Sequence, residues 1–350
     1  MALVAVFTSY ALENSRFGIL TRRLPYVVSY AVTDYFSQNK LILKSAPKNL
    51  KTNVDSLQVV FILGESVRAD HLQLNGYARE TNPLLSKRKN IISFSNMYTS
   101  NTYTAASIPQ ILTNASLSDD YNQPKYSLID ILNQAHIQTT WIGNQTPEKS
   151  YEMFIKQSGF SKIIDPLHSE LSFQKTYDEK LIPLFKSLYQ PNQNQFTTIH
   201  MMGSHWWYET RYPASFRKFK PVIQSKNIPS NSTEEMINSY DNTLVYLDFF
   251  INEIIQEVEK QNTKALIIYL ADHGELLVED KLWLHVQRGK AAENPAMLIW
   301  YSNKFQKTHS EIIDRWDRNH TKKTDLDFFF PSLISLFDIE GIDYNKNKTL

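Results

Sequence analysis

Cysteine is absent from this chain of 350 residues. Its absence excludes disulfide bonds, thiolate metal ligands and cysteine nucleophiles. It does not separate an oxidising from a reducing compartment, because proteins of either can lack disulfides. Glycine is scarce as well, with nine residues, so the glycines at 64, 203, 274 and 289 are informative where they adjoin candidate motifs.

The chain also lacks an excess of charge of either sign. It has 37 basic and 36 acidic residues and a formal net charge of +1, so no nucleic-acid partner is expected and any functional charge is local. Apolar residues make up 42% of the chain, which is enough for a sizeable core in one large α/β domain or two ordinary domains.

The N-terminal segment Met1–Leu12 is apolar but shorter than the roughly 20 residues that span a bilayer, and it lacks the basic start of a signal peptide. It is either the end of a transmembrane helix whose beginning is missing from this chain or a loose hydrophobic N-terminus. Basic and aromatic residues follow, which suit a membrane surface; the alternative is an amphipathic helix over Tyr26–Phe36 that packs on the main domain. The basic residues are Arg16, Arg22, Arg23, Lys40, Lys44, Lys48 and Lys51.

Strand and helix patterns alternate beyond the polar stretch 45–56, which reads as a linker. The apolar run Leu57–Leu63 is typical of a strand buried on both faces of a parallel sheet. Similar runs are Gln138–Ile142, Phe196–Met201, Ala265–Leu270 and Ala296–Trp300. A helix is expected over Asn242–Val258, and the capping pattern Ser232–Glu235 predicts the start of another helix before it. Shorter helices are expected around Leu128–Leu132 and Leu333–Phe337. The alternation predicts a doubly wound or three-layer α/β/α fold, with 206–231 as a functional loop.

Polar residues with metal-binding chemistry follow three of the predicted strands. Asp272-His273-Gly274-Glu275 offers ligands that suit zinc or manganese, although the aspartate could instead cap a helix. Glu65 follows the first strand and is either a ligand or an N-cap or surface charge. His205, after another strand, and His285 are ligands or packed histidines. Arg68 could steady a carboxylate, meet a phosphate oxygen or form a surface ion pair.

Thr104 lies in a polar loop before Ser107-Ile108-Pro109, a pattern that resembles a helix start. The amino end of a helix favours anionic oxygens, so this place suits a nucleophile that attacks a phosphodiester. A threonine hydroxyl held beside bound zinc can become a strong nucleophile. The combination favours a metal-dependent transferase acting on phosphate esters, provided that Glu65, Thr104, Asp272 and His273 converge on a single divalent cation.

Taken in order, the motifs resemble those of the lipopolysaccharide phosphoethanolamine transferases. This family belongs to the alkaline phosphatase/sulfatase superfamily and includes the mobile colistin-resistance enzymes. The resemblance covers about residues 57–345 and rests on Gly64-Glu65-Ser66-Val67-Arg68-Ala69, Asn75-Gly76-Tyr77-Ala78-Arg79-Glu80-Thr81-Asn82-Pro83, Thr104-Ala105-Ala106-Ser107-Ile108-Pro109, Met202-Gly203-Ser204-His205, Arg211-Tyr212-Pro213, Tyr240-Asp241-Asn242, Asp272-His273-Gly274-Glu275 and Leu284-His285.

The resemblance implies an α/β, three-layer, sulfatase-like fold with a mostly parallel central sheet, and a role for each motif. Catalytic zinc would be held by Glu65, Thr104, Asp272 and His273, with a second zinc left open. Thr104 would be the nucleophile that carries phosphoethanolamine, and His205 and His285 would bind the phosphate group, take part in catalysis or hold the second zinc. The residues expected to bind substrate are Arg68, Asn75, Ser107, His205 and His285.

The resemblance also implies a place and partners. Residues 1–50 would be a membrane-proximal segment and 51–350 a periplasmic catalytic domain of a bacterial inner-membrane enzyme. The chain would then be a truncated or separately encoded catalytic portion. Phosphatidylethanolamine would be the donor and lipopolysaccharide the acceptor, at lipid A or a core sugar.

Two departures weaken lipid A as the acceptor. Gln110 stands where members that modify lipid A have a cysteine, and Trp206-Trp207 follows His205 where they have Gly-Pro. The version Ile108–Thr113 is more similar to members that modify core sugars.

Other functions of the same superfamily remain open. They are a metal-dependent phosphatase or phosphodiesterase and a glycerol-phosphate transferase. A sulfatase is disfavoured, because Ser107-Ile108-Pro109-Gln110-Ile111 lacks the arginine of a Cys/Ser-x-Pro-x-Arg pattern. A non-enzymatic module that binds lipopolysaccharide is disfavoured by the intact set of predicted ligands.

Overall fold

The computed structural model describes residues 41–119, 121–165, 176–279, 282–285 and 287–350. The chain divides into a large unit, 43–119 with 125–350, and a small one, 1–42 with 120–124. The predictions for Met1–Leu12 and Tyr26–Phe36 lie outside the described residues. Within the described ranges, no helix has both the length and the apolar character needed to cross a membrane.

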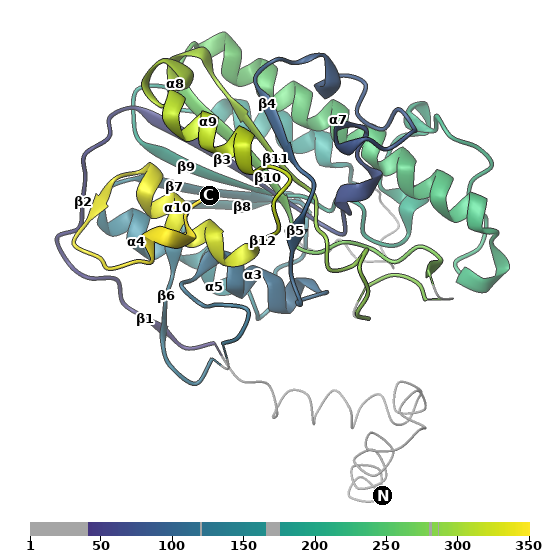
Figure 1. Ribbon diagram of the computed structural model, residues 1–350, viewed down its shortest axis with the longest axis horizontal. Coiled ribbons are helices and arrows are strands. Elements are labelled where there is room, and N and C mark those ends of the chain that lie inside the picture. The colour runs from purple at the N-terminus through teal and green to yellow at the C-terminus, as the bar shows by residue number, and fades with distance from the viewer. Residues whose placement is uncertain (1–40, 120, 166–175, 280–281, 286) are drawn as a thin grey trace, which may run out of the picture. The chain divides into compact units, whose positions relative to one another are not determined.

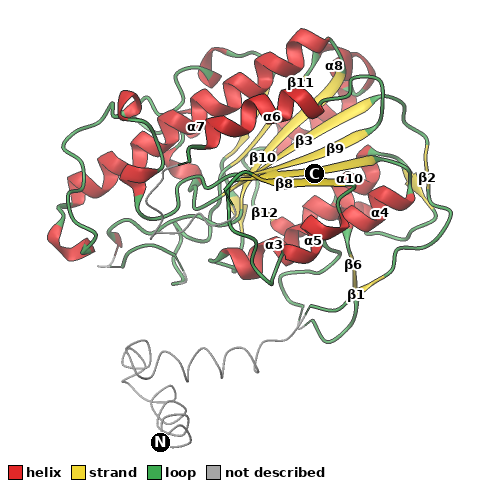
Figure 2. Ribbon diagram, turned by 180° about the vertical axis from the view of Figure 1, so that it is seen from behind, coloured by secondary structure: helices red, strands yellow, loops and turns green. Residues whose placement is uncertain are grey.

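The large unit is built on a seven-stranded sheet (Figures 1 and 2). Five neighbouring strands run parallel. Beside them, β11 is antiparallel to both of its neighbours, β10 and the outermost strand β4. In spatial order the strands are β4 (Ile91–Phe94), β11 (Met297–Tyr301), β10 (Lys264–Ala271), β3 (Leu57–Gly64), β9 (Gln195–His200), β7 (Gln138–Gly143) and β8 (Phe160–Ile163). Two-stranded sheets join β1 (Leu43–Lys44) to β6 (Lys125–Tyr126), β5 (Met97–Tyr98) to β12 (Thr324–Asp325), and β2 (Lys51–Thr52) to β13 (Ile339–Glu340).

Helices cover both faces of this sheet, which confirms the predicted three-layer α/β/α fold and its mostly parallel sheet. One face carries α6 (Leu181–Leu188) and α7 (Thr233–Gln261). The other carries α3 (Thr104–Leu112), α4 (Leu128–Gln134), α5 (Glu152–Gln157) and α10 (Phe329–Leu336). After β11 the chain forms α8 (Asn303–Thr308) and α9 (Ser310–Asn319).

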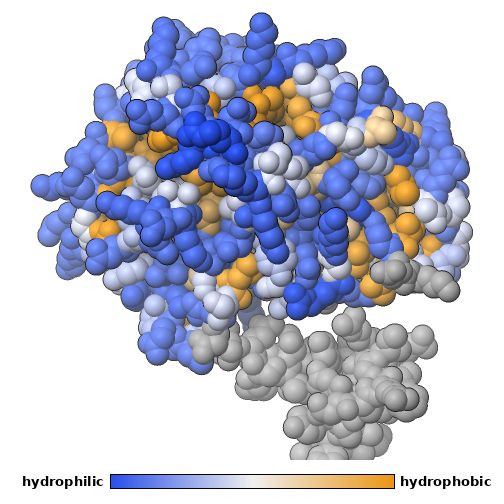
Figure 3. Space-filling model, viewed as in Figure 1, coloured by the Kyte–Doolittle hydropathy of each residue, from blue (hydrophilic) through white to orange (hydrophobic). Residues whose placement is uncertain are grey.

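The central strand β3 shows why the apolar run was a reliable signal. All eight of its residues are buried. Val60 and Ile62 belong to the core shared with α7, whereas the Phe61 ring lies 4.4 Å from the Phe329 ring of α10, between centroids. A strand covered on both sides favours apolar residues along its whole length and not only at alternate positions; in β3 the one buried polar side chain is Gln58, near its start. The surface seen in Figure 3 is mostly hydrophilic with scattered apolar residues, as expected for a core enclosed between the layers.

Two helix predictions are corrected by the structure. The capping pattern at Ser232 and Glu235 does form a reciprocal capping box, but it begins α7 itself, one continuous helix of 29 residues, instead of a separate helix before Asn242. Similarly, α3 begins at Thr104, and Pro109 lies inside it rather than at its start. Thr104 is therefore at the amino end of a helix, as predicted, but as its first residue.

Candidate metal centre

The candidate site lies at one edge of the parallel sheet, where its strands end. Glu65 follows β3, and Asp272 and His273 follow β10; β3 and β10 pair in parallel along their whole length, from Leu57 opposite Lys264 to Gly64 opposite Ala271. The carboxyl ends of parallel strands are the usual position of functional groups in such folds. Residues more than 200 positions apart in the sequence are thereby brought together.

Thr104 points at this edge from the first turn of α3. Tyr103 precedes it in extended conformation, and no side chain caps the helix. The Thr104 hydroxyl donates a hydrogen bond of 2.9 Å to Glu65 Oε2. The hydroxyl of the predicted nucleophile is thus held directly against a predicted metal ligand.

Glu65, Asp272 and His273 form a compact buried cluster. His273 Nε2 lies 3.4 Å from Glu65 Oε1 and 3.5 Å from Asp272 Oδ2. His273 Nδ1 is 2.7 Å from the Gly274 carbonyl, to which it can donate, and this leaves Nε2 as the nitrogen with a lone pair. In the described part of the chain, neither His273 Nε2 nor Asp272 Oδ2 has a hydrogen-bond partner, although both are buried. Buried polar atoms without partners, aimed at one another, are the donor set that a divalent cation requires.

The electrostatics of the three residues lead to the same conclusion. Burial and the neighbouring Glu65 charge raise the pKa of Asp272 to about 7. Burial lowers the pKa of His273, but Asp272 and Glu65 outweigh it and raise that pKa to about 10. Burial works against ionisation of Glu65, yet His273 holds its pKa well below the ordinary value. A bound divalent cation would relieve the repulsion between the two carboxylates.

The two other predicted histidines lie beside this cluster. The His285 ring is 4.9 Å from that of His273 and 5.6 Å from that of His205, between centroids. His285 Nδ1 faces Glu275 Oε2 at 3.4 Å, and Glu275 raises the His285 pKa although burial opposes it. His205 Nδ1 is 2.6 Å from the Trp206 carbonyl, and burial lowers the His205 pKa. With Glu275, His273 and His285 also form a second group with metal-ligand spacing.

Several residues at the site were not predicted from the sequence. Gln145 donates to Glu65 Oε2 at 3.2 Å and to the Met201 carbonyl at 2.7 Å. It follows β7, so the strand-end rule that selected Glu65 could have selected it too. Asp178 accepts hydrogen bonds from the amides of Met202 and Gly203 and so holds the turn before His205. No sequence signal marks Asp178, because it precedes a helix far from that turn in the chain.

Three residues predicted to bind substrate have partners within the protein. Arg68 is buried and pairs with Asp70 at 2.7 Å and Glu279 at 2.5 Å. The Asn75 side chain donates to the Ala69 carbonyl and accepts from Ser93. Ser107 Oγ donates to the Asn101 carbonyl. Their assignment to substrate binding stays a prediction, and these contacts give each of them a structural role.

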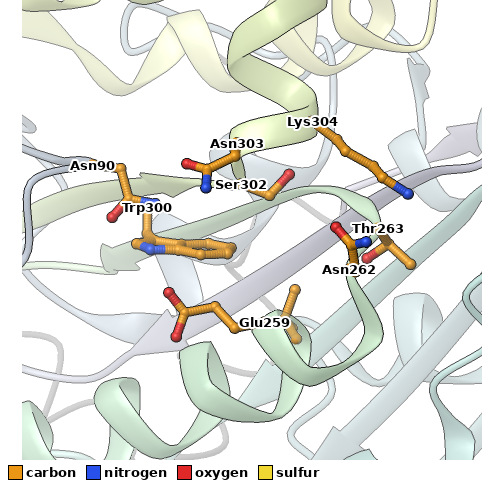
Figure 4. A pocket seen from close by; sticks show the side chains of 9 residues that line it. Asn90, Glu259, Asn262, Thr263, Trp300, Ser302, Asn303 and Lys304 are labelled. Carbon is orange, nitrogen blue, oxygen red and sulfur yellow. The ribbon is translucent and has the colours of Figure 1, made fainter.

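A separate pocket lies away from the cluster (Figure 4). The end of α7, the start of β10 and the turn from β11 into α8 border it, through Glu259, Asn262, Trp300 and Lys304 among others. Because β10 begins here and ends beside the candidate metal centre, the pocket is at the opposite edge of the sheet. It contains none of the predicted site residues.

Comparisons with known proteins identify the family and the fold of this chain. The family model described as Sulfatase matches residues 58–339. Phosphoethanolamine transferase EptA of Helicobacter pylori is 33% identical over 333 residues, which is 89% of this chain and 62% of that protein. The soluble domain of lipooligosaccharide phosphoethanolamine transferase A from Neisseria meningitidis superposes with a TM-score of 0.79 at 26% identity, covering 89% of this chain and 97% of that one.

A solved structure adds information on metal content in a protein of the same fold. The periplasmic domain of EptC from Escherichia coli, in complex with zinc, has a TM-score of 0.75 at 24% identity and covers 88% of this chain and 89% of that one. The predicted sulfatase-like fold is thereby confirmed. The chain spans 56% to 62% of the length of the first curated relatives that it matches.

Proposed function

The chain belongs to the sulfatase family, and from this premise we propose that it is the catalytic part of a zinc-dependent phosphoethanolamine transferase. The proposed reaction moves phosphoethanolamine from phosphatidylethanolamine to lipopolysaccharide, at lipid A or a core sugar, through a phosphothreonine at Thr104. Family membership narrows the chemistry to phosphate or sulfate esters, and the missing cysteine and arginine of the sulfatase pattern favour phosphate.

One observation carries this proposal. The Thr104 hydroxyl is hydrogen-bonded to Glu65 Oε2 at the amino end of a helix, beside a buried Asp272–His273 pair whose facing atoms have no partner in the described structure. A hydroxyl in a purely structural loop has no need of three buried ionisable neighbours. A nucleophile that must lose its proton and attack an anionic ester does.

The residues present fit zinc. Two carboxylates, an imidazole nitrogen and a hydroxyl are zinc ligands in kind and number, and Glu65, Thr104, Asp272 and His273 would hold the ion. Bound there, zinc would lower the pKa of the Thr104 hydroxyl and polarise the phosphoryl oxygens of the substrate. The name of the EptC complex, which includes zinc, supports the choice of metal.

In the first half of the proposed reaction, Thr104 Oγ attacks phosphorus. A bond from Thr104 Oγ to phosphorus forms while the hydroxyl proton passes to Glu65 Oε2, which already accepts its hydrogen bond. The bond from phosphorus to the diacylglycerol oxygen breaks, and that oxygen takes up a proton. Glu65 orients the attacking hydroxyl through its hydrogen bond. His285, with Nδ1 directed at Glu275, can hold a proton on Nε2 for the leaving oxygen.

In the second half, an acceptor hydroxyl or phosphate oxygen attacks the same phosphorus, the bond from phosphorus to Thr104 Oγ breaks, and Thr104 regains its proton from Glu65. His205 is suited to remove the acceptor proton, because the Trp206 carbonyl occupies its Nδ1 and leaves Nε2 as the base. The two histidine rings are 5.6 Å apart, so both can reach groups on one phosphorus.

The setting we propose is the periplasmic side of a bacterial inner membrane, with 51–350 as the catalytic domain and 1–50 as the membrane-proximal segment. Relatives described as periplasmic domains and as an integral membrane protein support this place. Both substrates are lipids, so a catalytic domain near a bilayer surface meets them where they reside.

The proposal is tested by mass spectrometry of protein incubated with phosphatidylethanolamine. We expect the mass of phosphoethanolamine on the peptide that contains Thr104, in the wild type and in Thr104→Ser. Thr104→Ala should carry no label while still binding zinc, if less tightly. Activity of Thr104→Ala equal to wild type would remove the mechanism.

Other outcomes of the same assay separate the competing functions. Steady release of free phosphoethanolamine without an acceptor would indicate a phosphodiesterase. Preferential labelling by phosphatidylglycerol in a lipid competition would indicate a glycerol-phosphate transferase. Protein that binds no zinc and takes no label would be a non-enzymatic module. Transfer from the labelled enzyme to defined lipid A or to core oligosaccharide then shows which of these two is the acceptor.

A further inference from the structure

The loop that leads to Thr104 is tied to the helix that follows by side-chain hydrogen bonds. Because no side chain caps α3, other contacts must fix where the helix begins. Asn101 Nδ2 donates to Gln110 Oε1 at 2.9 Å and to the Ala106 carbonyl at 3.4 Å. The Ser107 hydroxyl donates a hydrogen bond of 2.9 Å to the Asn101 carbonyl. These bonds close the segment around Thr104 from both sides.

The same connection continues from α3 to a distant part of the chain. Gln110 Nε2 donates to Asp327 Oδ1 at 2.7 Å, across 217 positions of sequence. Asp327, in the short 3-10 helix Leu326–Phe328 before α10, also accepts from the Leu117 amide and pairs with Lys348 at 2.7 Å. Gln110 is 1% exposed and Asp327 8%. The bond between Gln110 and Asp327 is therefore shielded from water, where hydrogen bonds hold geometry most firmly.

We propose that Asn101, Gln110 and Asp327, called here the 101–110–327 bridge, are positioning residues for the Thr104 nucleophile. The inference rests on the proposed function, which makes Thr104 the nucleophile. The bridge fixes the start of α3 and thereby the distance from the Thr104 hydroxyl to Glu65. Asn101 comes three residues before Thr104 and Gln110 six after, so the bridge spans the nucleophile in sequence and in space.

The order of donors and acceptors along the bridge decides which variants test it. The Gln110 carboxamide accepts from an amide on one side and donates to a carboxylate on the other, and Lys348 balances that carboxylate. Gln110→Met keeps the length of the side chain but removes both bonds. Gln110→Glu keeps the acceptor towards Asn101 and opposes the carboxylate of Asp327. Combining Gln110→Glu with Asp327→Asn restores a donor and an acceptor between the two side chains, in the reverse order and with the summed charge of the pair unchanged. It also disturbs the acceptor of the Leu117 amide and the ion pair with Lys348, so the rescue is partial.

Two readouts follow each variant. Hydrogen exchange of the backbone amides in 99–107 reports the order of the loop without any need for activity. The rate of phosphoethanolamine transfer to Thr104, with its kcat and KM and with the zinc content measured alongside, reports the chemistry. Gln157→Met, which removes a glutamine side chain that binds Ser127 from α5, is the matched control.

For Gln110→Met and Gln110→Glu we expect faster exchange in 99–107 and a kcat lower by about 10- to 100-fold, with KM within about twofold and zinc retained, because a displacement of about 1 Å at a reacting group has that effect. The Gln110→Glu/Asp327→Asn pair should lose less than the product of the two single effects, and Gln157→Met should change neither readout. A merely structural role would lower the melting temperature of the singles without the selective loss of kcat or its rescue.

Each remaining outcome decides the matter. Unchanged exchange and kcat in folded Gln110→Met overturn the proposal, and so does a double variant whose loss equals the combined losses of Gln110→Glu and Asp327→Asn measured singly. If Gln110→Met fails to fold, Asp327→Asn alone, which leaves an acceptor for Gln110, replaces it and should show a smaller loss. If the wild type itself takes no label on Thr104, the proposed function fails, and the exchange data then show whether the bridge orders the loop.

Discussion

At the scale of single residues, Asp272 decides whether the cluster is a metal centre. We expect Asp272→Asn to lower bound zinc from about one ion per chain to a small fraction and to lower transfer by at least about 100-fold, because a neutral amide is a poor zinc ligand. Metal analysis of purified protein, with Asp314→Asn in an exposed stretch of α9 as control, measures this.

Asp272→Asn should raise the stability of the metal-free protein, although it lowers zinc binding. The folded metal-free protein raises the Asp272 pKa from 3.8 to about 7, so the ionised carboxylate destabilises the fold at neutral pH. Asp272→Asn removes that charge, and the metal-free variant should need more urea to unfold than metal-free wild type at pH 7.5. A variant that is both less stable and still zinc-bound would contradict the assignment.

Residue-scale prediction from the sequence depended on a local rule with limited reach. The positions of Glu65, Asp272 and His273 at one edge of the sheet could be predicted, because they follow strands that the sequence shows as continuous apolar runs. Their role as metal ligands stays a prediction. Gln110 was recognised only as a departure from the cysteine found in relatives; its partners Asn101 and Asp327 are set by packing between α3 and the segment before α10, which no local pattern encodes.

At the scale of elements, the turn after β9 links the predicted metal ligand to the predicted acid–base histidine. Gly203 has φ of +54°, and a Cβ there would lie 3.0 Å from both the nitrogen and the oxygen of the Glu65 backbone. The Ser204 amide, next in the chain, donates to the Glu65 carbonyl at 3.0 Å. The turn therefore packs directly on Glu65, and any side chain at 203 must move one of them.

We expect Gly203→Ala to lower stability by about 1–2 kcal/mol from the left-handed backbone and to lower kcat by about 10-fold or more through displacement of Glu65 or His205. Gly76→Ala is the matched control, because Gly76 has φ of +92° with nothing within 4 Å of a Cβ. It should show a similar loss of stability without the loss of kcat. Urea unfolding and steady-state kinetics separate the two effects, and equal kinetics for both variants would mean that the turn does not set the site.

Element boundaries show where sequence reasoning reached its limit. The five predicted strands agree with β3, β7, β9, β10 and β11 to within a residue at either end, because most of their residues are apolar and buried. The two outermost strands, β4 and β8, were not predicted, since each has only four residues and β8 is largely exposed. The predicted start of α3 is too late because Pro109 resembles a first-turn proline, whereas the helix begins at Thr104, with Asn101 bonded to Ala106 and Gln110 from the preceding loop. The capping box at Ser232 was read correctly as a start, but the length of α7 depends on its packing along the whole sheet.

At the scale of the whole molecule, the parallel sheet gathers the candidate site residues where its strands end, and it also buries ionisable groups there. His200, the last residue of β9, is fully enclosed: its ring meets the rings of Trp141 and Tyr151 edge-on at 5.6 and 5.1 Å, and its Nδ1 has no hydrogen-bond partner within the described ranges. Burial lowers its pKa from 6.5 to about 4.

This burial gives the fold a dependence on pH that can be isolated. Between pH 6.5 and about 4 the unfolded chain takes up a proton at His200 and the folded chain does not, so stability present above pH 6.5 is lost as the pH falls, by about 3 kcal/mol at 1.36 kcal/mol per pKa unit. His200→Phe keeps an aromatic ring and removes the titration. Its free energy of unfolding should therefore fall by about 3 kcal/mol less than that of wild type over the same range, as measured by urea unfolding of metal-free protein.

His136→Asn, at an exposed position with φ of +58° that asparagine tolerates, should follow the wild type. Parallel pH curves for His200→Phe and wild type would mean that the buried ring accepts a proton in the folded state, and that this edge of the sheet is more open to water than its packing indicates.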